Sequence, residues 1–90
     1  MDGTPTAAGT ISLYPNAAKT YIKLMTDFID PNSNDDIIVT IIDMNGMYKF
    51  QQTYQHSLPE SIDVRDIIEG NYVVIVHQGN NIQQIRFIKK

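Results

Sequence analysis

Residues 70–90 read GNYVVIVHQGNNIQQIRFIKK. An apolar run at 72–76 leads to a polar turn at 78–81, whose glycine and two asparagines supply the positive φ that a short reversal requires. The run that follows alternates and places Ile85 and Phe87 on one face. The first run is β-branched on both faces, which predicts a strand buried on both sides. The whole stretch is therefore expected to form a β-hairpin.

Length and composition narrow the classes of protein. Ninety residues, 42% of them hydrophobic, suffice for one domain with a single core. Seven Lys and Arg against ten Asp and Glu argue against nucleic-acid binding. The absence of cysteine excludes disulfides, thiolate zinc sites and a thiol nucleophile, but it does not indicate a compartment.

The amino-terminal residues have neither the basic nor the apolar region of a signal peptide, and no run approaches the ~20 apolar residues of a membrane helix. Residues 1–9 are mostly small and polar, so we expect a linker there and a folded domain at 10–90. If the protein is exported, the amino-terminal signal therefore lies on a longer parent chain, from which we expect this domain to be cut.

Several further runs have the alternation and the turn signals of short strands. They lie at 11–14, 20–25, 37–43, 47–54 and 62–64. Asn45-Gly46 is a strong hairpin signal that should pair the fourth of these runs with the third. The residues expected to face the core are Ile22, Leu24, Val39, Ile41, Tyr48, Phe50 and Ile67. About seven short strands with no convincing helix predict an all-β fold, an immunoglobulin-like antiparallel β-sandwich.

The acidic loop before the third predicted strand has oxygen-bearing side chains at alternate positions, Asp30, Asn32 and Asn34, like the start of an EF-hand. The pattern then fails, because the glycine position holds Asp35 and the bidentate acidic position holds Ile41. A solvated loop with Asx turns is the favoured interpretation, and a looser calcium site is the alternative. We therefore assign no metal and no cofactor.

Nothing in the sequence assembles a catalytic site. His56 and Ser57 are neighbours in an extended segment, where side chains point to opposite faces, and a triad also needs an orienting acid. His77 alternates with apolar residues and is expected to be partly buried or at an edge. We therefore expect the domain not to be an enzyme.

Tyrosines are the other candidate binding residues, because exposed rings can stack on sugars. The candidates are Tyr14, Tyr21, Tyr54 and Tyr72. Two or more of these rings are needed in the core. Tyr72 is expected to pack inward with its hydroxyl reaching the backbone, as in a tyrosine corner.

Five motifs occur in an order and at a spacing that point to a known family. They are LYPNAAK at 13–19, IIDMNG at 41–46, IDV at 62–64, EGNYVVIV at 69–76 and IRFIKK at 85–90. Together they resemble the type A C-terminal sorting domain of the type IX (Por) secretion system, from about residue 11 to residue 90. The sequence departs from the family pattern at Ala17, where a second proline is usual, and at Arg86, where lysine is commoner.

The resemblance implies a secretion signal. Such domains close large exported proteins of Bacteroidota, reach the periplasm folded, and are recognised by the outer-membrane translocon. A sortase-like peptidase commonly removes them as the cargo is joined to lipopolysaccharide, and here the cut would fall in or before residues 2–9. The expected partners are the translocon, its shuttle, the peptidase and the cargo protein, and the cargo is secreted or held at the cell surface.

Within this resemblance, the residues that match the family's terminal motifs are the candidates for recognition. They are Gly70, Tyr72, Phe87, Lys89 and Lys90. A receptor could read this end by its shape and charge, with strand addition at the edge of the last strand as one mode. The alternative function is an immunoglobulin-like accessory module that binds carbohydrate or protein for a secreted enzyme. On that interpretation Gly70 is only a turn residue, Phe87 is only a core residue, and the two lysines only keep an edge strand soluble.

Overall fold

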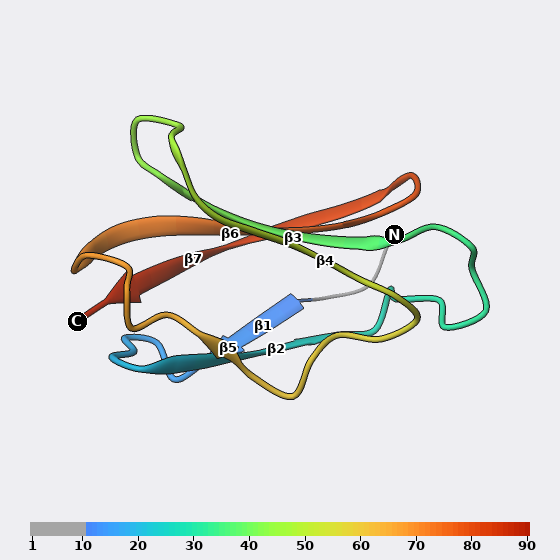
Figure 1. Ribbon diagram of the computed structural model, residues 1–90, viewed down its shortest axis with the longest axis horizontal. Helices are drawn as coiled ribbons and strands as arrows, with labels where there is room; N and C mark the ends of the chain where they lie inside the picture. The colour runs from blue at the N-terminus through green and yellow to red at the C-terminus, as the bar shows by residue number, and fades with distance from the viewer. Residues whose placement is uncertain (1–10) are drawn as a thin grey trace, which may run out of the picture.

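The computed structural model describes residues 11–90 and shows two antiparallel sheets packed face to face (Figure 1). The strands are β1 (Ile11–Tyr14), β2 (Tyr21–Thr26), β3 (Ile37–Asp43), β4 (Tyr48–Tyr54), β5 (Ile62–Asp63), β6 (Gly70–Gln78) and β7 (Asn81–Lys89). One sheet has the order β1-β2-β5 and the other β4-β3-β6-β7. The predicted all-β sandwich is confirmed, whereas the expected linker at 1–9 lies outside the described residues.

The hairpin of β6 and β7 forms as predicted and runs through the four-stranded sheet. Tyr72 lies opposite Phe87, and the register holds without a shift from Gly70 to Gln78. Of the turn residues expected to have a positive φ, Gly79 does, at +58°, whereas Asn80 and Asn81 do not. A Cβ built on Gly79 would lie 2.5 Å from Asp35 Oδ2, so a larger residue here would require the exposed Asp35 side chain to move aside.

The expectation that β6 is buried on both faces is wrong. Tyr72, Val74 and Val76 are buried on the inner face, but Val73 and Ile75 on the outer face are only half-buried. The sandwich has two layers, and in residues 11–90 no third layer covers the outer face of the sheet. A β-branched run therefore reflects strand propensity here as well as burial.

The Asn45-Gly46 hairpin pairs β4 with β3 as predicted, but Tyr48 does not face the core. Ile41 pairs with Phe50, whereas Ile42 pairs with Tyr48, so β4 carries one extra residue at this point. A one-residue bulge moves the side chains beyond it to the other face. Phe50 packs against the core, while Tyr48 is 69% exposed.

The core lies between the two sheets. Its fully buried side chains include those predicted from alternation, Ile22 in β2 and both Val39 and Ile41 in β3. Leu24 and Ile67 are buried as expected, and Phe87 of β7 is the largest side chain with no exposure. The apolar faces of β2, β3 and the hairpin β6–β7 thus supply much of the packing that holds the layers together.

Candidate functional site

The register of the last hairpin brings the sequence-predicted recognition residues to one end of the sandwich. Gly70 lies opposite Lys89, Tyr72 lies opposite Phe87, and Lys90 follows directly. The rings of Tyr72 and Phe87 are tilted by 34° with centroids 6.0 Å apart. Residues that are 15 or more positions apart in sequence thus form one structural unit.

Gly70 and Tyr72 fix the turn that enters β6. Gly70 has a φ of +155°, a conformation that residues with a Cβ rarely adopt. The Tyr72 ring lies beside Gly70, and its hydroxyl donates a hydrogen bond to the carbonyl oxygen of Ile68. The predicted inward packing of Tyr72, with its hydroxyl on the backbone, is confirmed. This bond holds the 66–69 turn against β6.

Most of the predicted recognition residues are inaccessible to a partner in the folded domain. Phe87 has no exposure, Tyr72 is 5% exposed and Lys89 is 8% exposed. The Lys89 ammonium donates to the carbonyl oxygen of Lys90 at 3.3 Å. Their side chains therefore shape the end of the sandwich, while its accessible surface is supplied by the residues between and beyond them.

The edge of β7 is capped where this strand ends. The Asn16 side chain accepts a hydrogen bond from the Ile88 amide and donates one to the Arg86 carbonyl, both at 2.9 Å. Ala18 continues the cap, because its amide donates to the Ile88 carbonyl at 3.0 Å and its carbonyl accepts from the Lys90 amide at 2.8 Å. Strand addition at this part of the edge would have to displace the cap.

Sequence reasoning missed this cap. In the sequence Asn16 follows a proline, and an asparagine in a turn commonly bonds to its own neighbours. Its partners here lie 70 and 72 positions away, so no local pattern could identify them. The only signal was its place within the family motif at 13–19.

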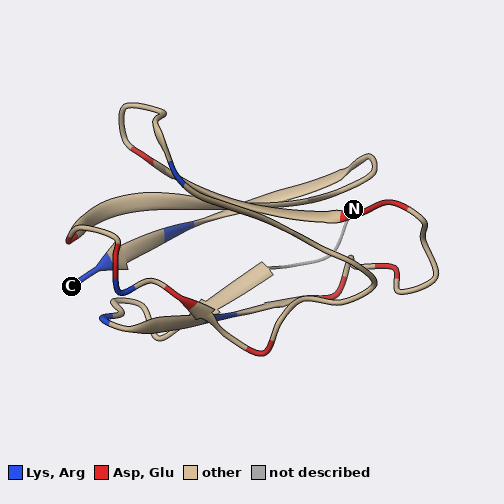
Figure 2. Ribbon diagram, viewed as in Figure 1, with Lys and Arg blue, Asp and Glu red and all other residues tan. Residues whose placement is uncertain are grey.

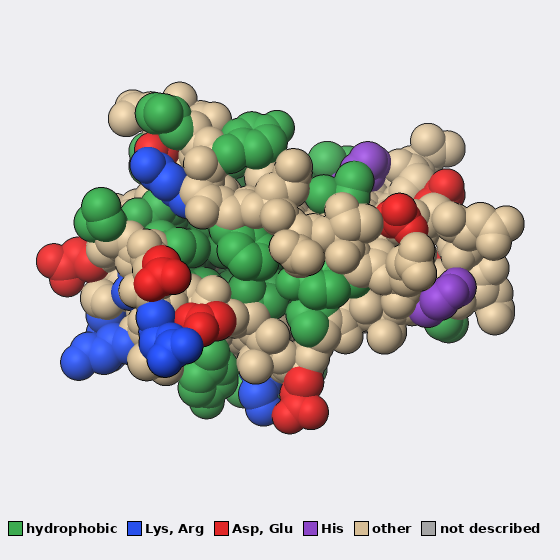
Figure 3. Space-filling view, in the orientation of Figure 1, with side chains coloured by type: hydrophobic (Ala, Val, Ile, Leu, Met, Phe, Trp, Pro, Cys, Tyr) green, Lys and Arg blue, Asp and Glu red, His purple; other side chains and the backbone are tan. Residues whose placement is uncertain are grey.

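Lys and Arg positions lie near the capped end, together with several Asp and Glu positions (Figure 2). Arg86 and Lys90 are exposed on β7 or just beyond it, Lys19 is exposed next to the cap, and Ile88 is 48% exposed between them. We call Lys19, Arg86, Ile88 and Lys90 the terminal patch. The same end in Figure 3 shows blue and red side chains side by side. The terminal patch is thus a group of three exposed cations and one apolar side chain, at an end of the sandwich that also carries the exposed acids Asp66 and Glu69.

An ion pair borders the terminal patch. The Arg65 guanidinium contacts the Asp63 carboxylate at 2.7 Å, and the hydrogen bonds from Arg65 lower the pKa of Asp63. Both side chains are more than half exposed, so the pair adds little to stability. Its charges largely cancel, which leaves Lys19, Arg86 and Lys90 as cations for a partner.

The acidic loop at 27–36 forms at the opposite end. Its Asx turn is confirmed, because the Asn32 amide donates to Asp30 Oδ1 at 2.9 Å. The buried Gln78 side chain accepts from the Asp30 amide at 2.8 Å and donates to its carbonyl at 3.0 Å. In the part of the chain that the structure describes, no group of three or more His, Asp or Glu side chains could hold a metal ion.

The two histidines bond to backbone. His56 Nδ1 donates to the Pro31 carbonyl at 2.9 Å, so its partner is not Ser57. His77 is half-buried, as predicted, and its Nε2 donates to the Gly79 carbonyl at 2.7 Å. No helix among residues 11–90 has the length and apolar character needed to cross a membrane.

Comparison with known proteins bears on the whole described fold. A family model described as a secretion system C-terminal sorting domain matches residues 12–90, nearly the full length of the chain. No curated protein matches the chain.

Proposed function

The chain belongs to the family of secretion system C-terminal sorting domains and is a sorting signal for type IX secretion, and we propose that the type IX machinery reads it at the terminal patch. A sorting domain acts with a cargo protein that precedes it, and the cargo is secreted or attached to the cell surface. Nothing favours the alternative function as an accessory module. The finer proposals concern which residues are read and which components read them.

Accessibility supports a division of roles among the predicted recognition residues. Lys90 is exposed and can contact a partner directly, whereas Phe87 and Tyr72 are buried and would act by holding the end in shape. Gly70 belongs with the second group because its backbone conformation sets the turn that Tyr72 closes. Lys89 joins β7 to the cap, since it bridges to Ala18. Recognition of a folded surface is the mode that this arrangement supports.

The single observation that carries the proposal is the cap on β7. It places Lys19, which is 71 positions from Lys90 in sequence, beside the last residues of the chain. An exposed cationic surface steers the approach of an acidic partner and contributes to specificity. We propose that the partner surface is acidic, that it belongs to the translocon or its shuttle, and that it meets the domain in the periplasm.

We further propose that a sortase-like peptidase separates the domain from its cargo on the amino-terminal side of β1. The expected cut in or before residues 2–9 falls outside the described residues. The amino-terminal end of β1 pairs with the carboxyl end of β2, as Ile11 lies opposite Thr26. The other end of β1 is the one that leads to the cap, so cleavage ahead of Ile11 would leave the terminal patch intact.

Charge reversal on the terminal patch tests this proposal. A reporter protein would be fused ahead of the chain in a bacterium with a type IX system, with Lys19→Glu and Lys90→Glu combined in one variant. We expect export to fall by at least about tenfold, because two attractive charges become repulsive. A variant that combines Asn34→Glu, Gln52→Glu, Gln55→Glu and Asn80→Glu is the matched control, since it makes the same change in net charge at exposed positions away from the patch.

The folded state of each variant must be shown by circular dichroism of the isolated domain. Export of the patch variant at the level of the parent, or equal loss of export in the control variant, would overturn recognition at the terminal patch. Neither result would overturn the sorting function itself.

A further inference from the structure

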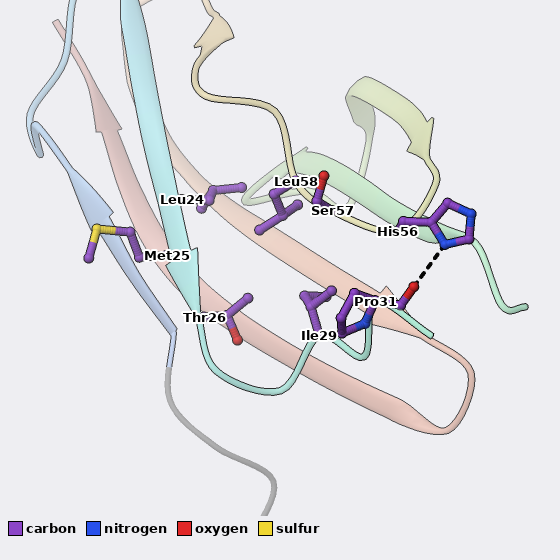
Figure 4. Close-up of a pocket in the computed structure, with 8 residues that line it drawn as sticks. All are labelled: Leu24, Met25, Thr26, Ile29, Pro31, His56, Ser57 and Leu58. Carbon is purple, nitrogen blue, oxygen red and sulfur yellow. Dashed lines mark hydrogen bonds between the residues drawn. The ribbon is translucent and has the colours of Figure 1, made fainter. Parts of the chain in front are cut away.

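A groove of about 380 Å³ lies beside β2, near the end of the sandwich that is opposite the terminal patch (Figure 4). Its wall on one side is β2 from Leu24 to Thr26, and its other walls come from the loops that carry Ile29, Pro31 and Leu58. This volume is at the lower end of the range for ligand sites in proteins, enough for one large side chain and a short length of backbone.

The backbone edge of β2 is open along this groove. The bond of 2.9 Å from the Val64 amide to the Thr20 carbonyl shows that Thr20 directs its polar backbone toward β5. The direction of the backbone N–H and C=O groups alternates along a strand. The polar backbone groups therefore also point toward the β5 side at Ile22, Leu24 and Thr26. Ile22 pairs with β5, but β5 ends before it reaches the other two.

The loop that replaces β5 does not complete the sheet. Within residues 11–90, no backbone hydrogen bond joins Leu24 or Thr26 to the segment 55–61 that lines the groove. The opposite edge of β2 is occupied beside the groove, since β1 pairs with residues 23–26 of β2. The groove therefore offers the donors and acceptors of a short stretch of unpaired strand.

Apolar side chains form the floor of the groove, and His56 fixes its width. Ile29 and Leu58 are both partly buried and pack against the core, so their positions are set by the fold. His56 has a left-handed φ of +69° and bonds to the Pro31 carbonyl, which ties the two loops together. In Figure 4 the side chains of Leu24, Ile29 and Leu58 gather on one side of β2, with Met25 on the other side.

The surroundings of the groove are acidic. Asp27 follows β2 directly, and Asp30 lies between two of the lining residues. A smaller polar hollow that shares His56 with the groove is lined by Asp35 and Asp36. Neither 24–36 nor 50–61 contains a lysine or an arginine. A partner with basic residues would therefore be attracted here, and an acidic one repelled.

We propose that this groove binds an extended peptide segment of a partner protein by strand addition. The segment pairs with the open edge of β2 at Leu24 and Thr26, places one bulky apolar side chain against Ile29 and Leu58, and carries Lys or Arg at its ends. Main-chain bonds supply affinity in such complexes, and the pocket and flanking charges supply specificity. The proposal is independent of the terminal patch, which lies at the other end of the domain.

A synthetic peptide of sequence KTVLVTK with blocked ends is the probe, titrated into the 90-residue domain and followed by the amide NMR signals. We expect saturable shifts of the Leu24 and Thr26 amides with a Kd on the order of 0.1 to 1 mM. The peptide ETVLVTE should bind at least about fivefold more weakly because it meets the acidic loops. The peptide KTPLPTK should not bind, because proline lacks the amide donor.

Two serines of the same loop provide matched variants. Ser57 is exposed and lines the groove, whereas Ser61 is exposed and lies outside it. Ser57→Trp should fill the groove and weaken KTVLVTK binding about tenfold or more, and Ser61→Trp should leave it unchanged. An absence of saturable shifts with KTVLVTK, or equal binding by the Ser57→Trp variant, would overturn the proposal. Equal binding of KTPLPTK would overturn strand addition as its mode.

Discussion

Tyr72 has two roles, one for its ring and one for its hydroxyl, and removal of the hydroxyl oxygen separates them. Its ring fills the space beside Gly70 and Phe87, and its hydroxyl satisfies the carbonyl of Ile68. The ring is buried, so its packing contributes to the core whether or not the hydroxyl is present. The hydroxyl, and not the ring, forms the hydrogen bond to the preceding turn.

Tyr72→Phe should therefore lower the free energy of unfolding by about 1 kcal/mol, the usual cost of losing a hydrogen bond to a buried group. Chemical denaturation of the isolated domain measures it. Tyr21→Phe is the control, because Tyr21 is 44% exposed and should change stability little. An equal loss of stability in both variants would show that the hydrogen bond from Tyr72 to Ile68 does not stabilise the domain.

Asp43 gives the β3–β4 turn a dependence on pH. Its carboxylate accepts hydrogen bonds from the Asn45 and Met47 amides, each at 2.9 Å. The bond from Met47 is the main cause that lowers the pKa of Asp43 below its ordinary value of 3.8. A lowered pKa means that this stabilisation is complete above the unfolded value and is lost as pH falls through the folded one.

We therefore expect the amide signals of Asn45 and Met47 to shift together at a pH below 3.8, as the Asp43 carboxylate takes up a proton. An NMR titration from neutral to acid pH measures this. Asp43→Asn should abolish the shared transition. Titration of these amides above the ordinary pKa of an aspartate would contradict the turn geometry.

At the level of elements, alternation and turn residues were enough to place every strand. The hairpins at Asn45-Gly46 and Gly79 could be predicted because their signals are local. The side of the sheet to which Tyr48 points could not be predicted, because one extra residue in β4 reverses the alternation. No residue pattern in the sequence indicates this bulge. Periodicity predicts elements well and fails where the pairing of two strands is irregular.

The candidate site also has features that the sequence predicts and features that it does not. Gly70, Tyr72 and Phe87 could be named from motifs, but their burial follows from how the two sheets close on each other. The cap by Asn16 and the open edge of β2 were beyond prediction, because both depend on segments that are distant in sequence. Such contacts are the product of the fold rather than of any local pattern.

The cap itself is testable at the level of the strand. Asn16→Ala removes both side-chain bonds to β7 and should expose the Ile88 amide to solvent. We expect hydrogen exchange at Ile88 to become at least about tenfold faster, while exchange in the middle of β6 is unchanged. Lys19→Ala, which removes a neighbouring exposed side chain, is the control. Unchanged protection of Ile88 would show that Asn16 does not hold this edge.

For the whole molecule, the buried residues of the last strand limit how export can be tested. Phe87→Ala would leave a cavity in the core and should cost about 3 to 5 kcal/mol. That is a large part of the stability of a small domain. Thermal unfolding should show a correspondingly lower Tm, so a loss of export on removing 87–90 would not distinguish recognition from unfolding. Substitutions at exposed positions avoid this ambiguity.

The two ends of the sandwich differ in charge. The end with the terminal patch carries both basic and acidic positions, whereas the loops at 27–36 carry only acidic ones (Figure 2). The groove lies beside those loops. Oriented charge of this kind favours one direction of approach to a charged partner. A sorting domain with this polarity can be held at one end while the other remains available for a second contact.

The most direct measurement of the central claim is the location of a reporter protein in a bacterium with a type IX system. The reporter would carry an amino-terminal signal for entry into the periplasm and would be compared with and without residues 1–90 fused behind it. The account predicts reporter at the cell surface or in the medium only when the domain is present. Reporter retained in the periplasm in both cases would contradict the sorting function.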